Sequence, residues 1–334
     1  MKTIFLAFCF TVFASTIKAQ FAPQAGIVGS TAIHKGSSQI VGWATNCIIN
    51  RGWMDIANPS LGLASAGDSS NAVGVADNLI VSLGDSGIAT LSFASPIING
   101  IGADFAIFEN GFLNATNNEE AFLELAFVEV SSDGINFFRF PTTCNTQDTQ
   151  QITGTGMPNT GDYIKAREIN NLAGKYIANY GTPFDLDDLK NTSGLNVNHI
   201  THIRIIDVIG DVSQHRSYDS EGNKINDPYP TPFPTGGFDL DAVAVLHQVS
   251  TRSTEFSTSQ PFAFYPNPMV ENLYFSTKEK LTIHLVNAWG QEAFNKVIYQ
   301  SETISLSTLQ PGIYYLSVKD NNNHQWKEKI IKLP

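Results

Sequence analysis

The stretch LELAFVEVSSDGINFFRF, residues 123–140, decides the fold class. In its first half Leu123 and Leu125 alternate with Glu124, which is the period-two pattern of a strand with one apolar face. The Asp-Gly pair at 133–134 then supplies the residues of a tight turn, and a second run rich in aromatic residues follows it. The stretch therefore predicts a β-hairpin and an all-β protein.

The same signature recurs on both sides of this hairpin. Further short strands are expected at 79–83, 88–93, 104–109, 200–208 and 238–246. The first two flank the turn tetrapeptide 84–87, which predicts a second hairpin. Helical signals are few, and residues 184–190 predict one or two turns. We therefore expect a jelly-roll-like β-sandwich in the central part of the chain.

Length and composition agree with this reading. The chain has 334 residues, which suggests two domains. Hydrophobic residues make up 42% and charged residues 15%, so a disordered chain or a coiled coil is excluded. The formal net charge of −11 argues against a nucleic-acid partner, because phosphate binding needs clustered cations.

The first residues predict a secretory signal peptide. Lys2 is followed by an uncharged apolar run, residues 4–14, and then by small residues up to Ala19. This run is too short for a membrane-spanning helix, which needs about 20 apolar residues. We expect cleavage after Ala19, so that residues 1–19 are removed. No later segment is apolar enough to cross a membrane, so none is expected in the mature protein.

A linker is expected at residues 248–261, because this segment is rich in Ser and Thr and has no apolar period. The charge balance also changes there. Residues 20–250 hold 24 acidic and 10 basic side chains, whereas residues 251–334 hold 7 and 8. We therefore predict an acidic domain at 20–247 and a second domain at 262–334.

The second domain has the strand and turn pattern of a small Ig-like β-sandwich. Its motifs appear in order at FYPNP (264–268), VNAWG (286–290), ISLSTL (304–309), PGIY (311–314) and KIIK (329–332). These motifs resemble the type A C-terminal sorting domain of type IX secretion cargo in the Bacteroidetes, over essentially all of 262–334. Asn287 stands where that family often has Asp.

The resemblance implies a route out of the cell. After the signal peptide directs the chain to the periplasm, the type IX secretion machinery of the outer membrane would read the sorting domain. The cargo would then be attached to the cell surface or released.

The acidic domain resembles the galactose-binding-like jelly rolls, a β-sandwich group found in many bacterial surface proteins. The resemblance rests on VSSDGINF (130–137), THIRII (201–206) and GFDLDAVAV (237–245). It implies a binding module, and such domains often hold a structural Ca²⁺ near the final strand.

Carboxylates at strand ends support the calcium expectation. Asp239 and Asp241 are two positions apart on an expected strand, so they would share a face. Asp104 and Glu109 bound another strand, and Ca²⁺ prefers such oxygen ligands. We therefore predict these four residues as metal ligands. The alternative is that they are solvated surface charges.

Removal of the signal peptide leaves two cysteines, Cys47 and Cys144. In an oxidising compartment they predict one disulfide closing a loop of roughly 100 residues. Two buried free thiols are the alternative.

The catalytic motifs sought are missing from the sequence: it has no GxSxG, HExxH or GxxxxGK[ST]. We therefore predict no catalytic residues and expect a non-catalytic binding protein at the cell surface or in the medium, with a glycan or another nutrient as ligand. Two alternatives remain. One is a capture protein for a cofactor-sized ligand, such as a corrinoid, that feeds an outer-membrane receptor. The other is a hydrolase with a dispersed carboxylate site.

Overall fold

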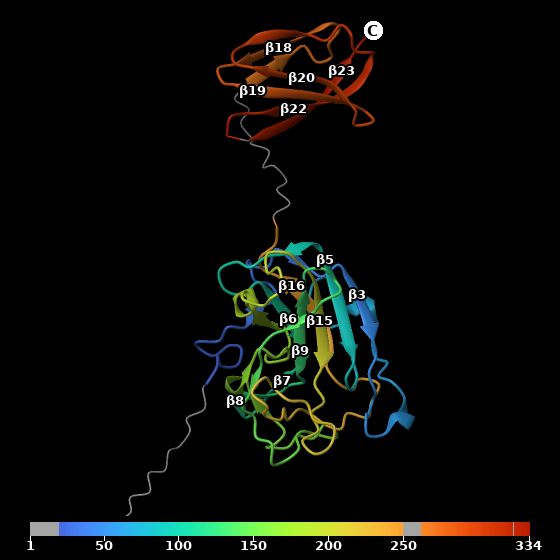
Figure 1. The fold of residues 1–334 in the computed structure, drawn as a ribbon, viewed down its shortest axis with the longest axis vertical. Helices are drawn as coiled ribbons and strands as arrows, with labels where there is room; N and C mark the ends of the chain where they lie inside the picture. Colours follow the sequence, from blue (N-terminus) through green and yellow to red (C-terminus); the bar gives the residue numbers. More distant parts are fainter. Residues whose placement is uncertain (1–19, 250–261, 323) are drawn as a thin grey trace, which may run out of the picture. The chain divides into compact units, whose positions relative to one another are not determined.

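The computed structural model describes residues 20–249, 262–322 and 324–334 (Figure 1). It divides into two compact units, Met1–Val249 and Ser250–Pro334. The boundary falls inside the expected linker 248–261. The expected signal peptide, 1–19, and linker residues 250–261 lie outside the described residues.

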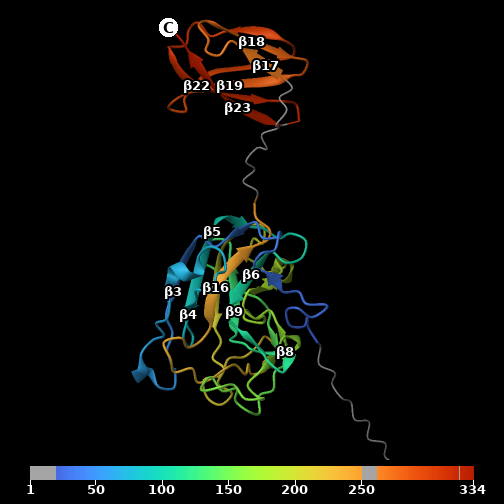
Figure 2. The ribbon, with the colours of Figure 1, turned by 180° about the vertical axis from the view of Figure 1, so that it is seen from behind.

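One face of the first unit is a six-stranded antiparallel sheet (Figure 2). Its main path runs through β1 (Ile33–His34), β14 (Tyr180–Phe184), β6 (Phe105–Glu109), β16 (Asp239–Val245) and β2 (Gly42–Trp43). The short β4 (Val81–Ser82) also pairs with β16. This sheet brings β6 and β16, which are more than a hundred residues apart in sequence, side by side.

The other face is a five-stranded antiparallel sheet, four of whose strands are labelled in Figure 1. It runs through β10 (Phe138–Arg139), β9 (Ala126–Ser131), β15 (Ile200–Asp207), β5 (Ile88–Ile97) and β3 (Asn46–Asn50).

The hydrophobic core lies between these two sheets. Phe105 and Val243 come from the first sheet, Leu91 and Ile203 from the second, and all four are fully buried in one cluster. Each such side chain stabilises the fold by about 1.5–3 kcal/mol. The predicted β-sandwich is therefore confirmed.

Two smaller sheets lie beside the sandwich. They join β11 (Thr143–Cys144) to β13 (Ile169–Asn170), and β12 (Ile164–Lys165) through β8 (Asn117–Phe122) to β7 (Phe112–Asn114). Four short 3-10 helices complete the described part of this unit: η1 (Pro59–Leu61), η2 (Ser69–Ala72), η3 (Ala166–Glu168) and η4 (Leu186–Leu189). The expected helical turn at 184–190 is confirmed by η4.

The hairpin predicted from residues 123–140 is confirmed, because β9 pairs with β10. Gly134 in its turn has a φ of 76°, a conformation that glycine adopts without strain. The hairpin predicted around 84–87 is wrong. There β4 and β5 belong to different sheets, so the turn carries the chain from one layer to the other. A Cβ on Gly84 would come within 2.6 Å of the Gly52 carbonyl oxygen, which explains the glycine.

The second unit is a separate two-layer β-structure with its own core. One sheet runs β17 (Phe262–Tyr265), β18 (Asn272–Thr277) and β21 (Glu302–Ser305). The other runs β20 (Glu292–Ile298), β19 (Leu281–Asn287), β22 (Gly312–Lys319) and β23 (Gln325–Lys332). Phe275 of the first sheet and Leu316 of the second are buried in the same cluster. The predicted small sandwich is confirmed.

Candidate ligand-binding site

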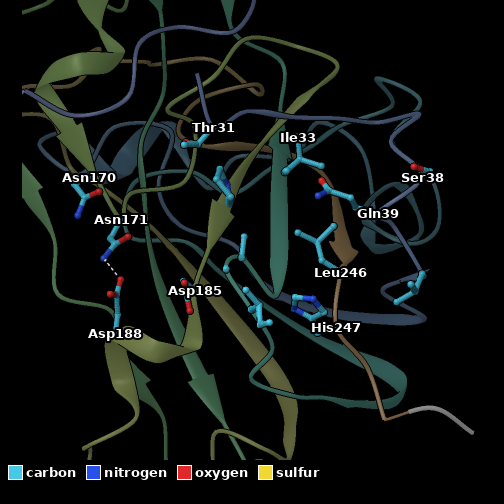
Figure 3. A pocket seen from close by; sticks show the side chains of 15 residues that line it. Thr31, Ile33, Ser38, Gln39, Asn170, Asn171, Asp185, Asp188, Leu246 and His247 are labelled. Atoms are coloured by element: carbon cyan, nitrogen blue, oxygen red, sulfur yellow. Dashed lines mark hydrogen bonds between the residues drawn. The ribbon is translucent and has the colours of Figure 1, made fainter. Parts of the chain in front are cut away.

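A cavity of about 710 Å³ opens at one end of the six-stranded sheet (Figure 3). Segments far apart in the sequence meet there: β1, β13, β14, η4, the residues that precede β6 and the residues that follow β16. The lining residues are Thr31, Ile33, Ser38, Gln39, Val41, Ile101, Gly102, Ala103, Asn170, Asn171, Pro183, Asp185, Asp188, Leu246 and His247.

Polar side chains stand on two sides of this cavity (Figure 3). One wall carries Asn170, Asn171, Asp185 and Asp188; the Nδ2 of Asn171 donates a hydrogen bond to Asp188 Oδ2 at 2.8 Å. The other wall carries Gln39, Ser38 and His247. Aliphatic side chains, among them those of Ile33 and Leu246, lie between or beside these groups. The arrangement offers hydrogen bonds from two directions over apolar surface.

A single buried carboxylate connects the two walls. Asp104 is completely buried, and its Oδ1 accepts hydrogen bonds from the Gly100 amide at 2.7 Å and from His247 Nδ1 at 2.8 Å. Its Oδ2 accepts from the Leu186 amide at 2.8 Å. Leu186 begins η4, which lies between Asp185 and Lys190, so Asp104 fixes the wall that carries Asp185 as well as the one that carries His247.

The ring of His247 is held by packing as well as by this hydrogen bond. A Cβ added to Gly100 would lie 2.3 Å from His247 Nδ1, so only glycine leaves room for the ring. The side chain of His247 is 35% exposed, and it lines the cavity. Because Asp104 occupies Nδ1, the Nε2 atom is the ring nitrogen left for a ligand.

The charged groups that line the cavity are acidic. Among its lining residues there are two carboxylates, Asp185 and Asp188, and no Lys or Arg. Burial raises the pKa of Asp185, and the nearby carboxylates of Asp104, Asp187 and Asp188 add to the rise. The local field therefore disfavours an anionic ligand.

The four residues predicted as calcium ligands do not form one group. Asp104 lies at the cavity end of β6 and Glu109 at the other end, roughly 16 Å away at 3.3 Å per strand residue. Asp239 lies near Glu109, because Leu240 is paired with Glu109. The described residues include no group of three or more His, Cys, Asp or Glu side chains arranged to hold a metal ion.

The two aspartates of β16 have different partners. Asp239 accepts hydrogen bonds from Ser82 Oγ and from Asn110 Nδ2. Asp241 accepts from the amides of Asp77 and Asn78 at 3.1 and 3.2 Å. A β-bulge between Leu240 and Ala242 interrupts the regular alternation that the shared face assumed. Asp241 Oδ2 is buried and has no hydrogen-bond partner among the described residues.

Buried acids gather at the end of the sandwich opposite the cavity. We call this the acidic end; it comprises Asp85, Glu109, Glu124, Asp207, Asp227 and Asp239. Burial raises the pKa of Asp85 and of Asp239 to about 6. Burial also raises the pKa of the other four well above the ordinary value, and repulsion among these acids adds to the rise.

Most acids of this end accept backbone hydrogen bonds from loops. The Asp207 carboxylate accepts hydrogen bonds from the backbone amides of Ser86 and Phe238, and the Asp227 carboxylate accepts one from the backbone amide of Leu125. They therefore fasten loops to the sandwich.

The regular alternation predicted Glu124 on the face opposite Leu123, where a solvated carboxylate would be expected. The side chain of Glu124 is instead buried, with the residue 9% exposed.

The two cysteines are free buried thiols. Cys47 belongs to the main core, whereas Cys144 belongs to a second cluster beside it. The structure therefore has two buried free thiols, the alternative given above, and not the predicted disulfide. Burial raises the pKa of Cys47 to about 12 and that of Cys144 to about 11, so both are unreactive.

Sequence reasoning missed His247, Asp185 and Asp188. A signal was present for the first: His247 follows one expected strand and Asp104 begins another. In an antiparallel pair the end of one strand meets the start of the other. The pairing itself, in which the amides of Leu246 and His247 donate to the Asp104 carbonyl, joins positions that no local pattern connects.

Comparison with known proteins identifies the C-terminal unit. Residues 263–333 match the family described as the secretion system C-terminal sorting domain. No curated protein matches the chain. Among the described residues no helix is long and apolar enough to cross a membrane.

Solved structures give only weak likenesses. A Ruminococcus gnavus β-glucuronidase in complex with uronic isofagomine has 9% identity and a TM-score of 0.18, covering 74% of this chain and 35% of that one. The Lactobacillus rhamnosus β-glucuronidase has 11% identity and a TM-score of 0.15, covering 74% and 36%. The chain spans about a third of the length of these enzymes. Likenesses this weak carry nothing about activity.

The sorting domain establishes the route of the protein. It is a cargo of type IX secretion, exported to the cell surface or the medium, and the secretion machinery is a partner of residues 263–333.

Proposed function

We propose that the exported protein is a non-catalytic binding protein whose first unit holds a glycan fragment in the cavity beside His247. The observation that carries the proposal is the pair of polar walls joined by Asp104. Sugar hydroxyls donate and accept hydrogen bonds, and the amides of Gln39 and Asn170 do both. The aliphatic side chains of Ile33 and Leu246, beside Gln39 and His247, suit the apolar faces of a sugar ring.

The size of the cavity suits a small ligand. A volume of about 710 Å³ lies within the range of roughly 300–1,000 Å³ typical of small-molecule sites. A mono- or disaccharide unit at the end of a longer chain would fit this description. Export to the cell exterior places the cavity where such glycans are met.

A hydrolase is the second candidate, and one observation favours it. A buried carboxylate that orients a histidine, as Asp104 orients His247, is also how many enzymes position a general base. Asp185 and Asp188 lie in the same cavity and could supply an acid. The two candidates differ in whether the bound sugar is released unchanged.

The test is a glycan array probed with the full chain, followed by calorimetry on the best binder. We expect saturable binding that Asp188→Asn weakens about tenfold, since it removes a charged acceptor from one wall. Asp148→Asn, at an exposed carboxylate outside the cavity, is the matched control. Absence of binding to every glycan overturns the proposal. Release of reducing sugar from the bound glycan would favour the hydrolase, and tight binding of a corrinoid would favour the capture protein.

We also propose a calcium site at Asp241. Its Oδ2 atom is buried and has no hydrogen-bond partner among the described residues, and of the charged groups nearby Asp77 repels the carboxylate whereas Lys35 attracts it. A cation between the two carboxylates would relieve this repulsion, with water and main-chain oxygens completing its coordination. Asp239 and Glu109 lie near enough to contribute charge, whereas Asp104 does not.

A further inference from the structure

We infer that His247 makes the cavity selective for uncharged sugars over sugar acids. This inference rests on the proposed function and deepens it, because it names the ligand class. It follows from which ring nitrogen of His247 carries the hydrogen and from the charges that face it.

Asp104 sets the state of the ring. Its Oδ1 already accepts a hydrogen bond from the Gly100 amide at 2.7 Å, so it acts as an acceptor towards His247 Nδ1 as well. Nδ1 therefore carries the hydrogen and donates. In the neutral ring the other nitrogen, Nε2, is then an acceptor. A ligand hydroxyl can donate to it, but a carboxylate, which only accepts, cannot.

The opposite wall presents acceptors too. Asp185 and Asp188 are carboxylates, and the Nδ2 group of Asn171 is engaged by Asp188 and by the Pro141 carbonyl. No Lys or Arg is among the lining residues. The carboxylate of a uronic acid would therefore face the acceptor Nε2 on one side and the negative charge of Asp185 and Asp188 on the other, with no cationic side chain in the lining to offset that charge. The matching neutral sugar has a hydroxymethyl group at that position, which can donate.

Asp104 acts as a positioning residue in this account, and Gly100 provides the space. A Cβ at Gly100 would lie 2.3 to 2.6 Å from three atoms of the His247 ring, so Gly100→Ala must push the ring from its place. The substitution leaves every polar group of the cavity present. It therefore separates the position of the ring from its chemistry.

The experiment compares matched sugar pairs on the full chain. The probes are the methyl glycosides of glucose, galactose and mannose, each with its own uronate, measured by calorimetry. We expect at least one neutral sugar to bind about tenfold or more tightly than its uronate. His247→Ala and Gly100→Ala should each weaken the neutral sugar about tenfold, whereas His247→Gln, whose Oε1 is again an acceptor, should restore most of the affinity.

Matched controls are His199→Gln at an exposed histidine and Gly161→Ala, where a Cβ meets nothing closer than 3.6 Å. If no neutral sugar and no uronate binds, the proposed function itself fails. If a neutral sugar binds but its uronate binds equally well, or if His247→Ala changes neither affinity, the selectivity inference is overturned while the binding function stands.

Discussion

Asp104 and His247 lie 143 positions apart in the sequence, and their side chains are joined by a hydrogen bond of 2.8 Å between Oδ1 and Nδ1. The same carboxylate also accepts a hydrogen bond from the Leu186 amide, at the start of η4. One buried side chain therefore holds both walls of the cavity. Its role is a consequence of the pairing between β6 and β16, which brings the start of one strand to the end of the other.

Replacing that carboxylate should cost stability. The Asp104 carboxylate accepts from three donors: the Gly100 amide, the Leu186 amide and His247 Nδ1. In Asp104→Asn one of them would face the hydrogens of the new amide group in place of an acceptor. We expect a loss of about 1–3 kcal/mol in the free energy of unfolding, the cost of a buried donor left unpaired. Urea unfolding of the full chain measures it, with Asp148→Asn as the exposed control. An unchanged midpoint would show that Asp104 does not fasten the two walls.

The acidic end predicts a stability that falls as the pH rises. The pKa values of Asp85 and Asp239 are about 6 in the folded protein, against about 3.9 in an unfolded chain. A raised folded pKa means that the folded state binds more protons, so the stabilisation is complete below pH 4 and is lost through pH 6. Each group contributes at most about 3 kcal/mol.

Denaturant unfolding of the first unit at pH 5 and pH 7.5 tests this. The carboxyls whose pKa is lowered, such as Asp211, stay ionised throughout this window and do not oppose the trend. Asp239→Asn should make the pH dependence shallower by the share of that one group, because the amide cannot ionise, while the other acids of the acidic end still contribute. The measurement is made in the presence of a chelator, so that no divalent cation stabilises the ionised acids. Equal or greater stability of the first unit at pH 7.5 than at pH 5 would then contradict the raised pKa values of the acidic end.

Calcium should raise the melting temperature of the first unit. A ligand that binds only the folded state adds about 2.7 kcal/mol at a hundredfold excess over Kd. We expect a rise of several degrees with millimolar Ca²⁺, abolished by Asp241→Asn and retained in Asp104→Asn, whose carboxylate lies at the other end of β6. If neither Ca²⁺ nor a chelator moves the transition of the wild type, the calcium proposal is wrong.

Residues 262–334 should be required for export and not for folding of the first unit. The family match at 263–333 and the separate core of this unit motivate the expectation. A chain truncated after residue 261 should accumulate in the periplasm, where fractionation would find it, and should keep the melting temperature of the first unit. Normal delivery of the truncated chain to the surface would refute the assignment.

The sequence predicted the layers of this fold better than its connections. The turn at Asp133-Gly134 between two apolar runs identified the hairpin of β9 and β10, because a tight turn is a local property of the sequence. The alternation of Leu123, Glu124 and Leu125 did not mark a strand, because these residues precede β9 and all three are buried. The turn at Gly84 was mistaken for a hairpin, since a turn between two strands does not say whether they share a sheet. The bulge beside Asp241 shifted side chains between faces in a way that no alternation reveals.

For the site, the sequence identified Asp104 as important but predicted a different chemistry for it. A carboxylate at a strand end reads as a metal ligand when its partners are unknown. Its donors come from Gly100, Leu186 and His247, and two of these are distant in sequence. Asp185 and Asp188 were missed because an acidic domain offers many carboxylates, and only the tertiary fold selects the two that line the cavity.

The most direct test of the central claim is the nitrogen NMR spectrum of the histidine side chains in the full chain, recorded while the best-binding neutral sugar is added. The account predicts that His247 starts with its hydrogen on Nδ1, and that its Nε2 resonance moves on saturation while those of His199 and His202 stay in place. A hydrogen on Nε2 in the free protein, or a His247 signal that does not move when the sugar is bound, would contradict it.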